Sequence, residues 1–380
     1  DSNLVGKTAD YICDGTADQV KINQAIDSLV DASGKKIPGV IYLLEGAYNI
    51  SGSINLDNTG AAGSTDSGKA LIGAGASTLL QLVAGTSSVD IIRASSVNTI
   101  LVSNLRIDGN SQTGSDNIGI YFSSVTDSKI DKVRVENMKS NGINLDVSSS
   151  NNTISGNIVQ GTLFYGIVLN SSSSNNTISG NIVQGGDNEA ISISFSDNNT
   201  ISGNNVQGNG TIGIQLWNSD NNTISGNNVQ GNGYAGIRPF NSSYNIISGN
   251  NLQGNSFHGI YAEFSDNNTI SGNNVQGNGY SGILLLQTSS NNTISGNRLS
   301  NTQREIAVRS DADNNLISSN HIYRSGAATD YYGIDVSGTG NYLVANYIYG
   351  TGFAAEISDL GTNTKYTGKD KLTLEPVTFT

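Results

Sequence analysis

Two groups of residues have the types and spacing that chemistry needs, and each is spread over neighbouring copies of a sequence repeat. The first group stands shortly before the dipeptide "GI" or "AI" in three successive repeats and comprises Lys139, Tyr165, Asp187 and Glu189. A cation that neutralises a uronate carboxylate, with a tyrosine and carboxylates that transfer protons, is the minimum for lyase or epimerase chemistry. Two carboxylates from neighbouring repeats could instead serve hydrolysis.

The second group contains one of the two histidines of the chain. Its members flank the same dipeptide in later repeats and are Arg238, His258, Tyr261, Glu263 and Arg304. Histidine, tyrosine and arginine together provide a base, an acid and a clamp for a carboxylate. The alternative for both groups is that their members are solvated turn residues, which the loops of acidic proteins carry routinely.

Aromatic residues concentrate around several of the "GI" isoleucines. If the residues after this isoleucine form a strand, the positions one and three after it face outward. The candidates for substrate binding at or near these positions are Trp217, Tyr234, Phe240, Tyr280 and Arg304. Exposed aromatic faces beside polar groups suit sugar rings. The alternative, for which Leu284 and Leu286 argue, is an interface between copies of the chain in a homo-oligomer.

The elements that position these residues are set by a repeat of about 23 residues. The "GI" isoleucines and their equivalents recur mostly every 23 or 24 residues from Ile120 to Ile357, with one interval of 28 residues after Ile306. Short stretches such as "NTIS" and "NNVQ" lack a helical period and are separated by Asn, Gly and Ser. Three short strands per repeat predict an all-β fold, a single-stranded right-handed parallel β-helix. Counted from Ile92, it has about twelve coils of about 23 residues.

Asparagines occupy fixed columns of the repeat. "NNTISGN" occurs six times, and a second column follows it from Asn157 to Asn346. Asparagine tolerates left-handed backbone angles at a turn, and stacked amides pass hydrogen bonds from coil to coil. The first asparagine of each "NNT" also satisfies the glycosylation sequon. We interpret the repeat as scaffold, because the motif returns at the same turn.

The two ends of the chain depart from the repeat. Thr16 and Gln19 have the spacing of a capping box, and an apolar face follows, so residues 16–32 are predicted to form an amphipathic helix that covers the first coil. This face is Val20, Ile22, Ile26, Leu29 and Val30. The expected organisation is an N-terminal cap over residues 1–50, a β-helix over 51–358 and a C-terminal cap or tail over 359–380.

Motifs at the N-terminus and in the coils resemble those of a known group of proteins. "ICDGTADQVKINQAID" followed by "GVIYLLEGAYNI" is similar to the N-terminal helix-and-strand signature of the pectate-lyase-like β-helix superfamily. "VSNLRIDGN" and the "NNTISGN" coils are similar to the same group, which includes phage tailspikes, mannuronan C5-epimerases and NosD-type repeats. The resemblance covers nearly the whole chain and implies the fold. It implies less about activity, because lyases, hydrolases, epimerases and non-enzymatic binders share this fold.

The catalytic motifs of two families in this superfamily are absent. Where the epimerase motif Y-G-x-D-P-H is expected, the chain has Asn141, Asn144 and Asp146 in place of tyrosine, aspartate and histidine. A tyrosine–histidine pair therefore cannot act at that coil. The polygalacturonase motifs are also missing. Pectate lyases of this fold bind calcium through clustered carboxylates, and the nearest candidates here are Asp108, Asp127, Asp131 and Asp146.

Composition limits the partners. The net charge of −12 and the low pI argue against nucleic acid and anionic membranes. The single cysteine, Cys13, forms no internal disulfide, and no apolar run reaches the length of a membrane span. No Cys/His spacing suggests zinc or copper, so no metal is assigned, although calcium stays possible. An extracellular, cell-surface or virion-surface location is expected.

These observations predict a polysaccharide-binding or polysaccharide-processing protein. The enzyme would be a uronate lyase or epimerase, or a glycoside hydrolase. The alternative is a non-catalytic structural, filament, adhesin or tailspike-shaft protein, because the near-identical coils between residues 151 and 297 serve repetition itself.

Overall fold

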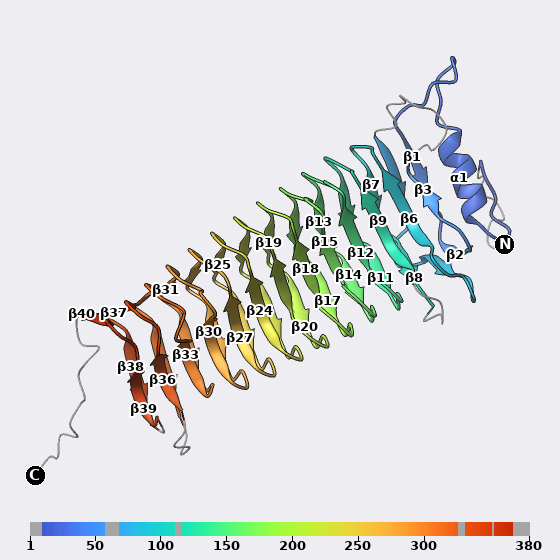
Figure 1. Cartoon of the computed structure of the whole chain (residues 1–380). Helices are drawn as coiled ribbons and strands as arrows, with labels where there is room; N and C mark the ends of the chain where they lie inside the picture. The colour runs from blue at the N-terminus through green and yellow to red at the C-terminus, as the bar shows by residue number, and fades with distance from the viewer. Residues whose placement is uncertain (1–9, 58–67, 111–115, 326–330, 352, 368–380) are drawn as a thin grey trace, which may run out of the picture. The chain divides into compact units, whose positions relative to one another are not determined.

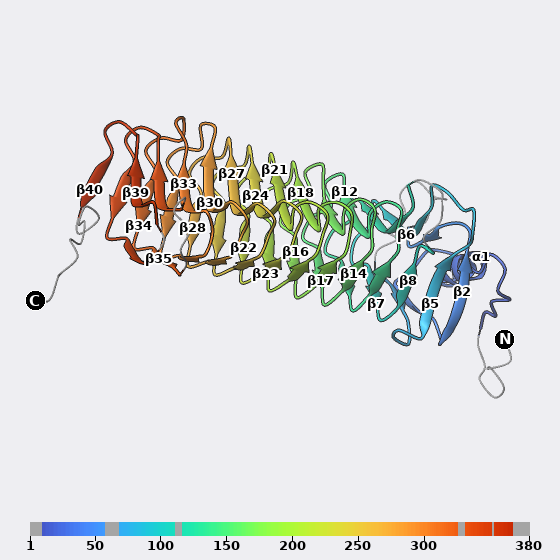
Figure 2. The same cartoon turned by 90° about the horizontal axis from the view of Figure 1, so that it is seen from below.

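The computed structural model describes residues 10–57, 68–110, 116–325, 331–351 and 353–367. The chain forms two units, Asp1–Ser219 (unit one) and Asp220–Thr380 (unit two). Within each unit, every coil contributes one strand to each of three parallel sheets (Figures 1 and 2). Neighbouring strands in a sheet are therefore three elements apart in the chain, which is the pattern of a parallel β-helix.

Unit one contains seven strands of each sheet within the described residues. The first sheet is formed by β1 (Gly39–Tyr42), β4 (Lys69–Ile72), β7 (Leu101–Ser103), β10 (Lys129–Asp131), β13 (Thr153–Ser155), β16 (Thr177–Ser179) and β19 (Thr200–Ser202). The second sheet is formed by β2 (Gly46–Ile50), β5 (Thr78–Leu82), β8 (Arg106–Asp108), β11 (Arg134–Glu136), β14 (Ile158–Gln160), β17 (Ile182–Gln184) and β20 (Asn205–Gln207). The third sheet is formed by β3 (Ile54–Asn55), β6 (Asp90–Ser95), β9 (Ile118–Ser123), β12 (Ile143–Asp146), β15 (Ile167–Leu169), β18 (Ile191–Ser194) and β21 (Ile214–Trp217).

Unit two repeats this arrangement. Its first sheet is formed by β22 (Thr223–Ser225), β25 (Ile246–Ser248), β28 (Thr269–Ser271), β31 (Thr293–Ser295), β34 (Leu316–Ser318), β37 (Tyr342–Val344) and β40 (Lys365–Thr367). Its second sheet is formed by β23 (Asn228–Gln230), β26 (Asn251–Gln253), β29 (Asn274–Gln276), β32 (Arg298–Ser300), β35 (His321–Arg324) and β38 (Tyr347–Gly350). Its third sheet is formed by β24 (Ala235–Phe240), β27 (His258–Glu263), β30 (Ser281–Leu286), β33 (Arg304–Val308), β36 (Tyr332–Val336) and β39 (Ala355–Asp359).

The predicted fold class and coil count are confirmed. From Ile92 to Ile357 the third sheet has six described strands in each unit, which agrees with about twelve coils. The register pairs equivalent residues of successive coils, as in Thr153 with Thr177 and Val159 with Val183. Crossover connections between parallel strands are right-handed in nearly all proteins, which fits the predicted hand.

The core of each unit is a stack of aliphatic side chains. One residue of each short strand in the first two sheets points inward and is fully buried, for example Ile154, Ile178 and Val159. In the third sheet the "GI" isoleucine points inward, and so does the glycine before it. A Cβ on Gly259 would lie 2.5 Å from Val275 Cγ1, a core atom, so this coil has little room beyond glycine, whereas Ala190 and Glu305 occupy the same position in other coils and are buried. The residue before that glycine therefore points outward.

The asparagine columns form ladders along the coils, as predicted. In unit two, the backbone N–H of Asn250 donates to Asn273 Oδ1 at 2.9 Å, and the Asn250 side-chain amide donates to the same oxygen at 3.0 Å. A second ladder, which includes Asn222 and Asn245, passes through the second asparagine of "NNT". All of these amides are buried.

One detail of the prediction is wrong, because turn geometry and laddering belong to different asparagines. The left-handed backbone angles occur at the first, exposed asparagine of "NNT", such as Asn151 with φ of 57° and Asn267 with φ of 58°. The ladder asparagines, such as Asn157 and Asn250, lie outside that region of backbone angles.

The N-terminal helix is shorter than predicted. Helix α1 spans Gln19–Asp27 and contacts the first strands of unit one, where Figure 1 shows it beside β1 and β3. No capping box forms, since the Gln19 side chain instead accepts a hydrogen bond from Ser51 N at 3.1 Å. Ile22 and Ile26 are buried as expected, whereas Val20 and Val30 are exposed. Among the described residues, no helix has the length and hydropathy needed to span a membrane.

Candidate functional site

The outer face of the third sheet carries three columns of variable side chains. They occupy the positions two before, one after and three after each inward isoleucine. The prediction recognised the last two positions. The first position includes Tyr165, His258 and Arg304. Its side chains face outward because the next residue, a glycine or its replacement, points inward, and only the structure shows this.

In unit two, three predicted catalytic residues contact one another across β24 and β27. Arg238 Nη2 donates to Glu263 Oε2 at 2.7 Å, and the Arg238 guanidinium carbon lies 5.3 Å from the centre of the Tyr261 ring. Burial raises the pKa of the Tyr261 phenol, and the negative charge of Glu263 adds to this effect. Tyr261 is therefore a protonated group that can donate, next to a carboxylate already held by an arginine.

His258 lies in the same cluster beneath aromatic rings. Its ring centre is 5.0 Å from that of Tyr261 and 5.7 Å from those of Tyr234 and Tyr280. Burial lowers the pKa of His258 to about 4, and the positive charge of Arg309 acts in the same direction. Nδ1 of His258 has no hydrogen-bond partner among the described residues. The imidazole is therefore neutral at pH 7, with a ring nitrogen free to accept or donate.

The column of His258 continues through two more unpartnered polar atoms. The register places Ser281 next to His258 and Arg304 next to Ser281. Ser281 Oγ and Arg304 Nη1 are buried without a hydrogen-bond partner in the part of the chain that the structure describes. Three such atoms on successive coils form an unsatisfied polar row, which is unusual in a folded protein and indicates a place for a ligand or water.

Arginines outnumber carboxylates at this end of the row. Arg304 Nε donates to Asp335 Oδ2 at 3.1 Å, and Arg309 Nη1 donates to the same oxygen at 2.9 Å. Two guanidinium groups thus share one carboxylate, and a net charge of +1 remains. The Arg304 guanidinium also lies 4.8 Å from the Tyr280 ring centre. The row therefore favours an anionic group.

The predicted binding residues distribute over both units. Tyr234, Phe240, Tyr280 and Arg304 lie in unit two around the cluster described above, with the Arg238 guanidinium 4.9 Å from the Phe240 ring centre. Trp217 lies in unit one at the end of β21 and is 39% exposed. These assignments stay predictions, although the contacts join four of the five residues.

The first predicted catalytic group is only partly assembled. Tyr165 and Glu189 are neighbours in the third-sheet column before the inward pair in unit one, because Ile167 pairs with Ile191. Burial raises the pKa of Tyr165, with a contribution from the charge of Glu189. Lys139 and the exposed Asp187 lie in the turns before β12 and β18, and no described contact joins them to the tyrosine.

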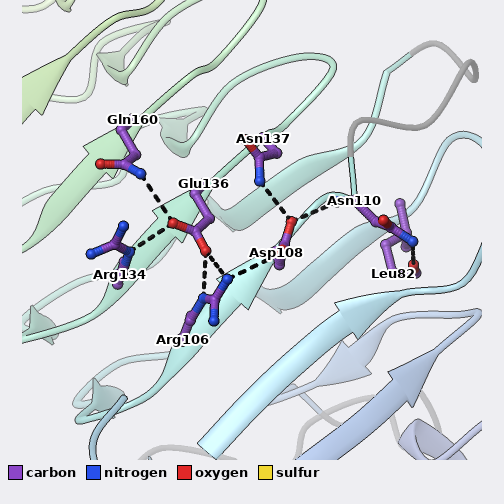
Figure 3. Close-up of polar contacts among 8 residues, drawn as sticks. All are labelled: Leu82, Arg106, Asp108, Asn110, Arg134, Glu136, Asn137 and Gln160. Carbon is purple, nitrogen blue, oxygen red and sulfur yellow. Dashed lines mark hydrogen bonds and ion pairs between the residues drawn. The ribbon is translucent and has the colours of Figure 1, made fainter. Parts of the chain in front are cut away.

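An arginine–carboxylate cluster on the second sheet of unit one escaped the sequence analysis. Figure 3 shows Glu136 between Arg106 and Arg134, with Arg134 Nε donating to Glu136 Oε2 at 2.7 Å. Gln160 Nε2 donates to the same oxygen at 3.1 Å, and a chain of glutamine amides continues to Gln184. Positive and negative charges balance here, so this cluster fastens one end of a glutamine ladder.

The carboxylates considered for calcium are not brought together. Asp108 lies on the second sheet and accepts from Arg106 and Asn137, whereas Asp131 lies on the first sheet and Asp146 on the third. Asp127 lies in the turn before β10. Among the described residues, no group of three or more His, Cys, Asp or Glu side chains is placed to hold a metal ion.

Two family models match parts of the chain. Residues 86–258 match the model of the periplasmic copper-binding protein NosD, and residues 240–368 match that of the right-handed β-helix region. The described residues of this chain do not supply the donor set that copper needs. No protein with curated function has a significantly similar sequence. With the strand topology, these matches identify the chain as a member of the right-handed parallel β-helix superfamily.

Solved structures of two polysaccharide-acting enzymes and of a tailspike protein share this fold. The A-module of mannuronan C-5 epimerase AlgE4 from Azotobacter vinelandii is 18% identical with a TM-score of 0.67, and the match covers 94% of this chain and 98% of that one. The catalytic unit of a thermostable GH87 α-1,3-glucanase from Streptomyces thermodiastaticus is 16% identical with a TM-score of 0.63, covering 95% and 68%. The Dettilon tailspike protein is 16% identical with a TM-score of 0.61, covering 90% and 66%. At these identities the likeness defines the fold.

Proposed function

We propose that unit two binds an acidic polysaccharide on the outer face of its third sheet and processes it there. The observation that carries the proposal is the row of three buried, unpartnered polar atoms on His258, Ser281 and Arg304 beside two arginines that share one carboxylate. A sugar carboxylate satisfies this row, because the guanidinium and the hydroxyl donate to its oxygens. Similar folds in a polyuronate epimerase and a tailspike are consistent with a carbohydrate role.

The aromatic rings around the row fit the apolar faces of sugars. Phe257 is 50% exposed and Tyr280 is 37% exposed, and both rings lie beside the His258 ring. Exposed rings next to hydrogen-bonding groups are the usual composition of a saccharide site. In this proposal the two rings move aside and stack on the sugar whose carboxylate enters the row.

The chemistry that this cluster supports is proton transfer at the carbon next to the carboxylate. Neutral His258 accepts the proton from that carbon through Nδ1, while the guanidinium of Arg304 stabilises the charge that spreads onto the carboxylate. Tyr261, still protonated, then donates its phenolic proton. Donation to the departing glycosidic oxygen completes β-elimination, in which a carbon–oxygen bond breaks and a carbon–carbon double bond forms. Donation to the opposite face of the same carbon completes epimerisation.

The test measures which polysaccharide fragments the full chain binds and which products it forms from them. We expect alginate and polygalacturonate fragments to bind, and Arg304→Ala to weaken this binding at least about tenfold, because a hydrogen bond to a charged group contributes about 1.5–3 kcal/mol. Arg298→Ala is the matched control, since Arg298 is an exposed arginine on β32 of the second sheet. Ultraviolet absorbance of unsaturated products, reducing ends and NMR distinguish elimination, hydrolysis and epimerisation. Equal binding by Arg304→Ala and the wild type would overturn the proposal.

A structural role is the second candidate, and the ladders favour it. Buried asparagines connect successive coils in both units, as Asn181 does with Asn204 and Asn273 with Asn297. Such ladders stiffen a shaft without needing any chemistry on its surface. The similarity in fold to a tailspike protein fits this candidate as well. Absence of any glycan binding, together with resistance to heat and proteases, would favour the shaft over the enzyme.

A further inference from the structure

The third sheet of unit one contains an arrangement that repeats a part of the unit-two cluster. Arg93 on β6 lies over the Tyr121 ring on β9, with 5.6 Å between the guanidinium carbon and the ring centre. In unit two, Arg238 lies over Tyr261 in the same column, also from successive coils, at 5.3 Å. Each tyrosine has a carboxylate beside it in the column three after the isoleucine. In unit one this is Asp146, whose Oδ2 accepts from the Tyr121 hydroxyl at 3.4 Å.

The residue that follows the tyrosine in its column differs between the units. Leu284 follows Tyr261, whereas Asn144 follows Tyr121 and lies between it and the apolar Val168. Asn144 is 9% exposed, and its Oδ1 has no hydrogen-bond partner among the described residues. A buried amide oxygen without a donor costs stability, so its position on an outward-facing column points to a ligand that supplies the donor.

The charge around Asn144 identifies the kind of donor. Beside Tyr121, Arg93 is paired with Asp90 and the Asp146 carboxylate accepts from the Tyr121 hydroxyl, so one guanidinium and two carboxylates give a net charge of −1. An acidic sugar would be repelled here. A divalent cation also fits poorly, because no described group of three or more His, Cys, Asp or Glu side chains is placed to ligate one. Neutral hydroxyl groups donate to carboxylate and amide oxygens without either obstacle.

We infer that Tyr121, Asn144 and Asp146 form a second saccharide site, in unit one, that takes a neutral sugar through two neighbouring hydroxyl groups. One hydroxyl donates to Asn144 Oδ1 and the other to the Asp146 carboxylate. The half-buried Tyr121 ring provides the apolar surface beside them, and the buried Val168 packs against Asn144 on the next coil. Arg93, held by Asp90 with 3.7 Å between Nη1 and Oδ2, positions the tyrosine ring. The site stands apart from the acidic-sugar proposal, because it uses other residues and the opposite charge.

Binding of neutral gluco-, manno- and galacto-oligosaccharides to the full chain, measured by calorimetry, tests this site. We expect at least one of these series to bind, and Asn144→Leu to weaken it about tenfold, as the loss of one buried hydrogen bond predicts. This variant installs the leucine that unit two has in the same column, and it removes an unpaired amide. Its melting temperature should therefore stay at or above that of the wild type, so lost binding is not unfolding.

Three controls keep the outcome decisive. Ser192→Ala changes another buried polar residue in the same column and should leave neutral binding unchanged. Arg304→Ala should also leave neutral binding unchanged while it weakens acidic binding, so the two proposals fail separately. Asp146→Asn keeps an acceptor oxygen and should weaken neutral binding less than Asp146→Ala. The inference is overturned if no neutral series binds, or if Asn144→Leu binds as tightly as the wild type.

Discussion

The two units place an arginine over a tyrosine in the same column of the third sheet, but they surround the pair differently. In unit two the pair is closed in. Tyr261 is 6% exposed, and Arg238 is held by the buried Glu263. In unit one the pair is open, because Arg93 is exposed and Tyr121 is only half-buried. One backbone scaffold thus supports a desolvated cluster and a solvated one.

The arginine–tyrosine pair is closed in unit two and open in unit one because of the side chains in the column two residues before the inward isoleucine. In unit two this column carries His258, Ser281 and Arg304, and the aromatic residues just before them cover the face. In unit one the equivalent residues next to the pair are Asp90 and Ile118. Because charges interact more strongly where water is excluded, the same arginine and carboxylate have larger energetic consequences in unit two. The side chains of neighbouring coils therefore determine the chemistry of the arginine–tyrosine pair more than the pair itself does.

Removal of the carboxylate in each unit gives the largest expected contrast. Glu263→Ala leaves the Arg238 guanidinium without its partner in a largely buried place, and breaking such a pair costs about 3 kcal/mol of unfolding free energy. Asp146→Ala removes two hydrogen bonds at a more open place, one from the Tyr121 hydroxyl and one from Val147 N, and should cost about 1–2 kcal/mol. Urea unfolding of both variants measures the difference. Glu263→Gln, which keeps an acceptor for Arg238, should recover part of the loss. Equal costs in the two units would contradict the contrast between closed and open pairs.

Acid should destabilise unit two through His258. The folded-state pKa of His258 is lowered from 6.5 to about 4, so the folded protein takes up this proton less readily than the unfolded chain. The stability that this group contributes is complete above pH 6.5 and is lost as the pH falls toward 4. The loss amounts to about 3 kcal/mol. His258→Phe keeps an aromatic ring and should flatten this part of the stability–pH profile.

The other histidine provides the control for that profile. His321 is exposed on the second sheet, and His321→Phe should leave the acid dependence as it is in the wild type. Unfolding midpoints in urea between pH 4 and 7 compare the three proteins. A profile of His258→Phe that coincides with the wild type would show that the histidine is not buried in its neutral form.

The fold could be predicted because each coil repeats the same sequence pattern. A fixed period, one inward aliphatic residue per short strand and the laddered asparagines gave the coil number and the register. The cap was predicted less well, because Gln19 hydrogen-bonds to Ser51 from another element instead of to its own helix. Such a contact depends on tertiary structure and leaves no mark in the local sequence.

The candidate site could be predicted only in part. Alternation indicated that Arg238, Tyr261 and Glu263 face outward, and their contacts follow from stacking. Strict alternation along the strand, however, would turn the side chain two residues before the isoleucine inward. This side chain points outward because the glycine between the two residues also points inward. The site around Asn144 was missed because that residue counted as a lost catalytic position. Its unpartnered oxygen is a property of packing.

The last contrast concerns the residue that follows the tyrosine in each unit. Leu284 is 6% exposed, and Leu284→Asn would give unit two the residue that unit one has in this column. The exchange removes a buried leucine and buries an amide in its place, so it should cost about 2 kcal/mol in unfolding free energy. It should not create neutral-sugar binding, because the neighbouring Glu263 is already engaged by Arg238, whereas Asp146 makes no ion pair among the described residues. Calorimetry with the neutral oligosaccharides checks this. Stronger neutral binding by Leu284→Asn would mean that the asparagine alone creates the site, and the carboxylate beside it would lose the role proposed for it.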